Sequence, residues 1–240
     1  MRPTIRTLAI AALLLVPASS LRAQTAVNPS GHWEGSIEAP GMTVSIEIDL
    51  VKNGNGQLAG TFGQPAQHLK GLPLTSFSVE GRSVSFQIKG GAPGQRVFIG
   101  ELTADGKSMS GSFASQFGPV SFGLIRTDDA RIEAAPKSAS IGKELEGTWN
   151  GALDVDGGVQ LVLTMANQPD GTATGSILNV NEGLEIPIAG ITQKATSVTL
   201  EVKAVVSSYS GTLSADGTEL VGTFVQGPTT LPLTFRRAKR

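Results

Sequence analysis

The chain has no cysteine and only two histidines in 240 residues. Without cysteine no disulfide framework can form, so each folded unit must be held together by its own hydrophobic core. A zinc site needs three or four converging ligands, and two histidines far apart in the sequence cannot begin one. Beyond the N-terminus, no apolar run is long enough to span a bilayer. We therefore expect no metal, no cofactor and no membrane span.

The N-terminus carries the pattern of an export signal. Two arginines precede an apolar stretch over residues 8–16, which is too short to cross a membrane. We expect cleavage after Ala23, which makes residues 1–23 a signal peptide and residues 24–30 a disordered tail. The mature protein is then periplasmic or extracellular. Cleavage removes three arginines and leaves 16 basic and 20 acidic residues, a balance that argues against a nucleic-acid partner.

Four short motifs occur twice in the same order, which indicates an internal duplication. The offset between the copies stays between 111 and 116 residues, so insertions are small and fall in loops. We expect one domain over residues 31–127, a second over residues 146–238, and a linker over residues 128–145. The repeated motifs are GHWEG (31–35) and GTWNG (147–151), LTADG (102–106) and LSADG (213–217), MSGSF (109–113) and LVGTF (220–224), and PVSF (119–122) and PLTF (232–235).

Within each copy, apolar and polar residues alternate between frequent turn residues, which predicts β-strands joined by tight hairpins. Val44, Ile46 and Ile48 share one face of a strand, whereas Ser45 and Glu47 share the other. Short connections favour antiparallel, up-and-down pairing. In the second copy the expected strands cover residues 147–155, 159–167, 172–178, 184–192, 196–203, 206–214, 218–225 and 229–236, and the first copy contains the same eight.

Four strands in each copy place a glycine on the inward face between two apolar residues. Glycine weakens a strand unless the chain bends sharply or something approaches closely, and a small closed barrel needs such bends. The pattern therefore predicts an all-β protein of two tandem eight-stranded barrels rather than a flat sheet. The glycines are Gly35, Gly60, Gly100 and Gly111 in the first copy and Gly151, Gly175, Gly211 and Gly222 in the second.

Each copy opens with Gly-x-Trp and closes with an arginine, and this combination resembles the calycin group of barrels, which includes the lipocalins. The resemblance implies that Arg126 lies on Trp33, and Arg237 on Trp149, at a closed barrel end. The second copy also resembles a lipocalin-like domain found N-terminal to secreted bacterial serine hydrolases. The elements it shares with that domain are DGTATG (170–175), IPI (186–188), YSGTL (209–213) and LPLTFR (231–236). The Gly-x-Ser-x-Gly motif of such a hydrolase does not occur in the chain.

No catalytic site is recognisable in the sequence. Nucleophilic catalysis needs a base near a serine and a third group that orients the base. His32 is on the outward side of its strand, opposite Trp33, so we expect it on the solvated surface. His68 lies in a loop and has no counterpart in the second copy. We therefore expect that the protein is not an enzyme.

Two functions stay open at this point. In the first, solid barrels serve as a docking or accessory module for another exported protein. In the second, hollow barrels bind a small apolar or lipid ligand, which an eight-stranded barrel can hold. The inward residues that would line such a cavity are Phe86, Phe98, Phe113, Tyr209 and Phe224.

Overall fold

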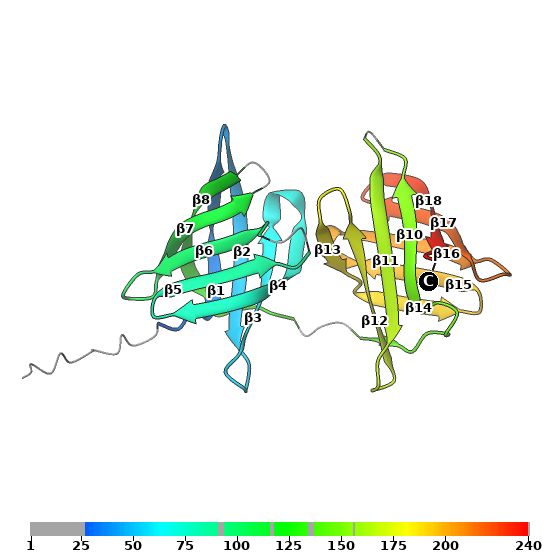
Figure 1. The fold of residues 1–240 in the computed structure, drawn as a ribbon, viewed down its shortest axis with the longest axis horizontal. Helices are drawn as coiled ribbons and strands as arrows, with labels where there is room; N and C mark the ends of the chain where they lie inside the picture. The colour runs from blue at the N-terminus through cyan, green and yellow to red at the C-terminus, as the bar shows by residue number, and fades with distance from the viewer. Residues whose placement is uncertain (1–26, 91–93, 116–117, 134–136, 156, 240) are drawn as a thin grey trace, which may run out of the picture.

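The computed structural model describes residues 27–90, 94–115, 118–133, 137–155 and 157–239. Within these residues the protein is all-β, and two antiparallel barrels lie side by side (Figure 1). The predicted fold class is confirmed. No helix in this described part of the chain could cross a membrane. The expected signal peptide lies outside the described residues.

The first barrel is closed by eight strands in up-and-down order. Its first strand pairs with both the second and the eighth strand, which leaves no free edge. A short 3-10 turn, η1 (Pro65–Gln67), connects the third and fourth strands. The strands are β1 (Gly31–Ala39), β2 (Met42–Lys52), β3 (Leu58–Gln64), β4 (Leu69–Glu80), β5 (Ser83–Ile88), β6 (Val97–Leu102), β7 (Ser108–Ser115) and β8 (Gly118–Asp128).

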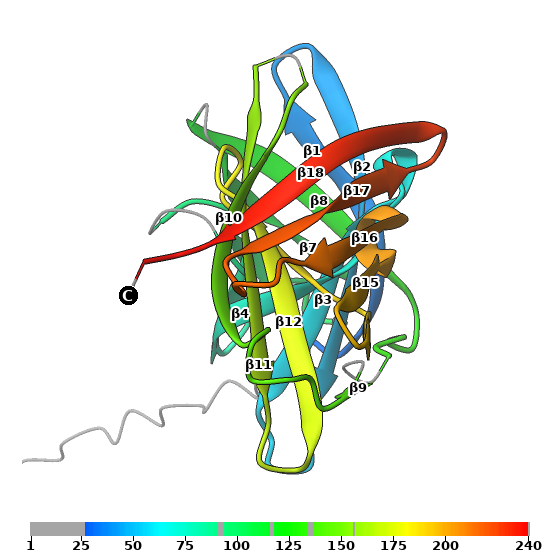
Figure 2. The same ribbon diagram turned by 90° about the vertical axis from the view of Figure 1, so that its right-hand side faces the viewer.

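The second barrel follows the same order but is nearly rather than fully closed. Figure 2 shows its strands in two sets, with β15 to β18 crossing β10 to β12 at a steep angle. A second 3-10 turn, η2 (Lys203–Val205), follows the strand β15. The strands are β10 (Gly147–Leu153), β11 (Val159–Asn167), β12 (Thr172–Asn179), β13 (Leu184–Pro187), β14 (Gly190–Lys194), β15 (Ser197–Val202), β16 (Ser207–Leu213), β17 (Glu219–Gln226) and β18 (Thr229–Arg237).

The strand expected over residues 184–192 is interrupted and forms β13 and β14. At this point the chain changes partners: the Ile188 N–H donates to the Gly175 carbonyl of β12, and the Ala189 N–H donates to Glu201 of β15. The fourth strand of the first barrel makes the same transfer without a break, since β4 pairs first with β3 and then with β5. The interruption is therefore a local difference between two equivalent strands.

Part of the expected linker belongs to the second barrel. A two-residue strand, β9 (Ser138–Ala139), pairs with the start of β12, and Ser138 Oγ accepts a hydrogen bond from Ile191 N–H of β14 at 2.7 Å. Ile141 and Leu145 are buried in the core of this barrel. We call residues 137–146 the strap, because they cross the end of the barrel that holds Trp149. Residues 137–145, which the sequence assigns to the linker, therefore pack with the second barrel.

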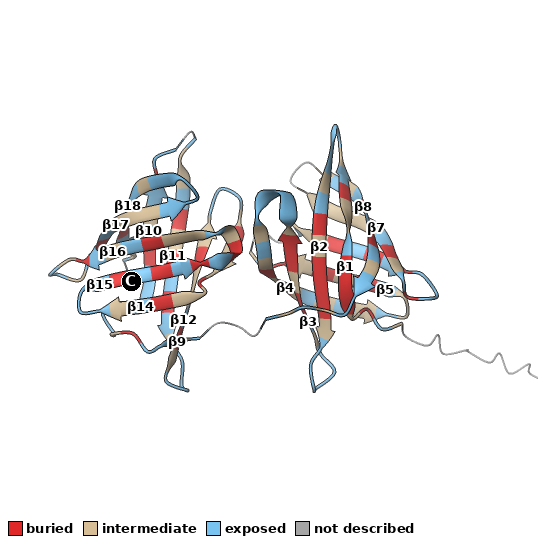
Figure 3. Cartoon of the chain, turned by 180° about the vertical axis from the view of Figure 1, so that it is seen from behind, coloured by how far each residue is buried: buried red, intermediate tan, exposed pale blue. Residues whose placement is uncertain are grey.

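The cores follow the predicted alternation, with buried residues at every second position of most strands (Figure 3). One register differs from the sequence alignment of the copies. Strand pairing makes Phe122 equivalent to Leu233, because Phe122 lies opposite Gly111 and Leu233 lies opposite Gly222, the equivalent glycine of the second barrel. The alignment of PVSF with PLTF is thus two residues out of register. The corrected offset of 111 residues also keeps Arg126 equivalent to Arg237.

The inward glycines allow backbones and rings to approach closely. A Cβ added to Gly222 would lie 2.2 Å from the Ser210 carbonyl oxygen and 2.8 Å from Tyr209 Cζ. A Cβ on Gly100 would lie 2.8 Å from the ring of Phe122. Glycine at these positions is therefore required by the packing of a neighbouring strand or aromatic ring.

We expect Gly222→Ala to lower the free energy of unfolding by about 1–3 kcal/mol, because the added methyl collides with backbone. The matched control is Gly123→Ala, an outward strand glycine whose added Cβ would meet nothing within 4 Å. That change should stay within about 0.5 kcal/mol or stabilise slightly. Urea unfolding followed by circular dichroism measures both, and equal effects would contradict the packing argument.

Candidate functional site

The interior of the first barrel is occupied by an aromatic cluster centred on Phe98. Its ring centroid lies 4.5 Å from that of Phe113 and 5.1 Å from those of Phe86 and Phe122. Phe62 completes the cluster at 6.0 Å. These separations are those of favourable aromatic contacts. The three candidate ligand-lining residues of this barrel therefore pack against one another.

Tyr209 holds the corresponding place in the second barrel and is fully buried. Its hydroxyl donates a hydrogen bond to the Leu220 carbonyl at 2.9 Å, and its ring packs edge-on against Phe235 at 5.3 Å. Burial raises the pKa of the phenol, which keeps it a neutral donor. The hydroxyl of Tyr209 is thus occupied by a hydrogen bond to the backbone of the barrel.

Two of the five candidates, Phe113 and Phe224, are only partly buried. Each lies near the last turn of its barrel, at the end opposite the tryptophan. Both rings pack against the core of their barrel but are less buried than Phe86, Phe98 and Tyr209.

A tryptophan and an arginine meet at the other end of each barrel. In the first barrel, Arg126 Cζ lies 4.7 Å from the Trp33 ring centroid, within cation–π range. Arg126 also donates to the Asn28 carbonyl at 2.5 Å, and the Trp33 indole donates to the Pro29 carbonyl at 2.9 Å. Residues 27–30 are therefore tied to the barrel, contrary to the disordered tail expected over residues 24–30, of which 24–26 lie outside the described residues.

The second barrel repeats this arrangement with the strap. Arg237 Cζ lies 4.1 Å from the Trp149 ring centroid, and the Trp149 indole donates to the Leu145 carbonyl at 3.1 Å. Arg237 also donates to the carbonyls of Glu144 and Glu146. In both barrels, the segment preceding the first strand supplies backbone acceptors that hold the Trp–Arg pair. These four side chains join the first and last strands of each barrel to the segment that precedes it.

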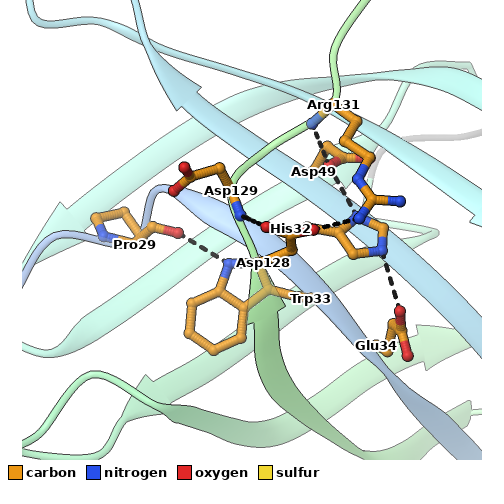
Figure 4. A network of polar contacts seen from close by, with 8 residues as sticks. All are labelled: Pro29, His32, Trp33, Glu34, Asp49, Asp128, Asp129 and Arg131. Atoms are coloured by element: carbon orange, nitrogen blue, oxygen red, sulfur yellow. Dashed lines mark hydrogen bonds and ion pairs between the residues drawn. The ribbon is translucent and has the colours of Figure 1, made fainter.

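A polar network around His32 was missed by sequence reasoning (Figure 4). His32 was expected on the solvated surface, but only 5% of it is exposed. Its Nδ1 lies 2.9 Å from Asp49 Oδ1 and its Nε2 lies 3.3 Å from Glu34 Oε1. The outward direction of the side chain was predicted correctly; the burial was not, because the segment after β8 crosses over it.

Arg131 fastens this crossing segment to the barrel. Its backbone N–H donates to Asp49 Oδ1 at 2.7 Å, and its guanidinium pairs with Asp128. The hydrogen bond from Arg131 is the main cause that lowers the pKa of Asp128. Both nitrogens of the buried imidazole thus face carboxylates, and the network joins three chain segments. This geometry suits a structural clamp better than a general base, which needs a reacting group within reach.

The second histidine is placed differently. His68 ends η1 in the left-handed conformation, with φ of 54°, and is exposed. Among the described residues, no three His, Asp or Glu side chains converge as metal ligands would.

Comparison with known proteins leaves the family open. No protein-family model and no curated protein matches the chain. A "putative outer membrane protein" from Bacteroides fragilis is 13% identical, with a TM-score of 0.27, over 88% of this chain and 97% of that chain. A protein of unknown function from the DUF3598 family of Nostoc punctiforme is 14% identical, with a TM-score of 0.25, over 87% of this chain and 96% of that chain. At these TM-scores neither structure informs the function.

The His32 clamp can be tested against the second copy, which has Thr148 and Thr164 at the equivalent paired positions. His32→Thr leaves the buried Asp49 carboxylate without its imidazole partner and should cost about 1–3 kcal/mol. Adding Asp49→Thr should recover part of that loss, because the pair then matches the second barrel. Strictly additive losses in urea unfolding would show that the two side chains do not act as a unit.

The packing of Tyr209 gives a second test. Tyr209→Ala should lower the free energy of unfolding by about 3–5 kcal/mol, since a solid core cannot refill the space. Tyr209→Phe removes only the hydrogen bond to Leu220 and should cost about 0.5–1.5 kcal/mol. If Tyr209→Ala instead has the same free energy of unfolding as the parent protein, the barrel interior contains unfilled space and the core is not solid.

Proposed function

We propose that the protein is an exported, non-catalytic docking or accessory module for another exported protein. The observation that carries this proposal is the filled interior: Phe98 is surrounded by four rings, and the Tyr209 hydroxyl is satisfied by backbone. A barrel whose interior is filled with packed side chains offers its outer surface for binding. The resemblance to a domain that precedes secreted serine hydrolases supports the same role.

The outer face of the first barrel supplies a surface suited to a partner. Ile99 on β6, opposite Ser112 of β7, is 58% exposed, and Ile125 on β8, opposite Ser108 of β7, is 62% exposed. Both isoleucines lie on the outward face of neighbouring strands, four positions apart along β7, and exposed apolar residues on one sheet face are a feature of interaction surfaces. We name Ile99, Ile125 and these two serines the β7 face.

The second copy lacks both isoleucines, although Val221, at the position of Ser110, is 52% exposed there. The position of Ile99 is taken there by Ser210, and that of Ile125 by Arg236, which pairs with Glu219 at 2.9 Å. The same backbone accepts a polar residue and an ion pair at the two positions. The isoleucines of the first barrel are therefore explained better by binding than by folding.

Binding of a small apolar or lipid ligand is the second candidate. The partly buried Phe113 and Phe224 favour it, because each leaves apolar ring surface at an open barrel end. Such a ligand would bind at the mouth of a barrel and not within it.

The two functions can be separated with protein purified from its host. If the protein docks a partner, an exported protein should co-purify with the parent chain and with Ser210→Glu. It should be lost with the double variant Ile99→Glu/Ile125→Glu. Equal retention by the double variant would contradict the β7 face as the binding surface. An apolar molecule seen in the native mass spectrum, lost on Phe113→Ala or Phe224→Ala, would favour the ligand function instead.

A further inference from the structure

The two barrels contact each other through their fourth strands and the chain that follows their fifth strands. β4 of the first barrel touches both β13 and η2 of the second. Lys89 Nζ lies 2.9 Å from Glu185 Oε1, and Arg96 donates to the Glu182 carbonyl at 2.8 Å. Leu184 and Ala204 belong to the second barrel but are buried in the core cluster of the first. The barrels are thus packed together as well as tethered.

Strand pairing identifies equivalent positions on the two sides of this junction. Pro73 lies opposite Thr61 of β3, and Pro187 lies opposite Ser176 of β12, so the two prolines correspond. Both line the same cleft between the barrels, which has a volume of about 200 Å³. Equivalent residues of the two copies therefore face one shared space.

The end of the fifth strand shows the same correspondence. Val84 and Val198 each lie opposite the glycine of the sixth strand, which makes Lys89 equivalent to Lys203 and Gly90 to Ala204. In the first barrel this segment touches the start of β13, and in the second barrel the equivalent η2 touches β4. Each copy thus offers its fifth-strand end to the fourth strand of the other.

An interface in which the same patch serves on both sides is isologous, the type found in two-fold symmetric dimers. We propose that the two copies form an internal dimer through this patch, so that the partner it fits is a second barrel of the same kind. The linker fixes which two barrels meet, but the patch itself holds them together. This inference is independent of the docking function, because the β7 face lies on other strands.

Gly90 supplies the sharpest steric test of the interface. A Cβ added there would lie 2.7 Å from Glu185 N and from the Gly183 carbonyl oxygen, both in the second barrel. Gly94 is the matched control: it has a similar φ, +80° against +96°, but its added Cβ would meet nothing within 4 Å. The two substitutions carry similar backbone strain, and only one of them pushes on the other barrel.

The experiment uses the full chain with a protease site inserted after Glu133, between the barrels. After cleavage, the two halves should still sediment as one particle at micromolar concentration. Gly90→Ala and Lys89→Glu should each weaken their association by about tenfold or more, whereas Gly94→Ala should not. Adding Glu185→Lys to Lys89→Glu should restore it by exchanging the charges. Halves that separate while folded, or glycine variants that behave alike, would overturn the proposal.

A second measurement on the uncut chain guards against variants that fail to fold. In a Trp149→Phe background, Trp33 alone reports the unfolding of the first barrel. Ala204→Glu, made in the second barrel, should lower that transition because Ala204 is buried against the first barrel. Val206→Glu, at a residue that is 64% exposed in the same segment, should leave it unchanged. If Ala204→Glu leaves the unfolding transition reported by Trp33 unchanged, the barrels do not stabilise each other and the proposed internal dimer is wrong.

Discussion

The packing of aromatic rings over glycines is the constraint on which both barrels depend. Tyr209 lies so close to Gly211 and Gly222 that a Cβ on either would come within 2.8 Å of its ring or hydroxyl. In the first barrel, Phe122 lies equally close to Gly100. A ring of this size fills the space that a small barrel encloses only if the facing strand has no side chain. Glycine and ring therefore act together, and together they fill the interior around Tyr209 and Phe122.

Most of the fold could be predicted from local patterns. The period-two alternation gave the strands, because it reports which face of each strand is buried whatever its neighbours are. The repeated Gly-x-Trp and the closing arginines pointed to equivalent barrel ends. What failed depended on contacts between distant segments. His32 is buried by the crossing of Arg131, and residues 137–146 complete the second barrel although they show no alternating pattern.

The differences between the copies separate the demands of folding from those of binding. Trp33 and Trp149, with their arginines, occur in both barrels and make the same backbone contacts. Other equivalent positions have diverged: a buried His–Asp pair is replaced by two threonines, and the exposed Ile125 is replaced by Arg236. One copy thus serves as an internal reference for the other. Residues common to both barrels serve barrel closure, whereas the diverged positions carry contacts particular to one copy, such as the His32–Asp49 clamp.

Closure of each barrel also bears on when the chain can fold. β1 pairs with β8, and β10 pairs with β18. The first strand of each barrel therefore cannot complete its pairing until the last strand is available. Contacts between residues so far apart in sequence make folding slow, because chain entropy is lost before the contacts form. A chain threaded through a translocation channel from its N-terminus cannot make these contacts until nearly a whole copy has emerged. The first and last strands of each copy must therefore be available together before either barrel can close.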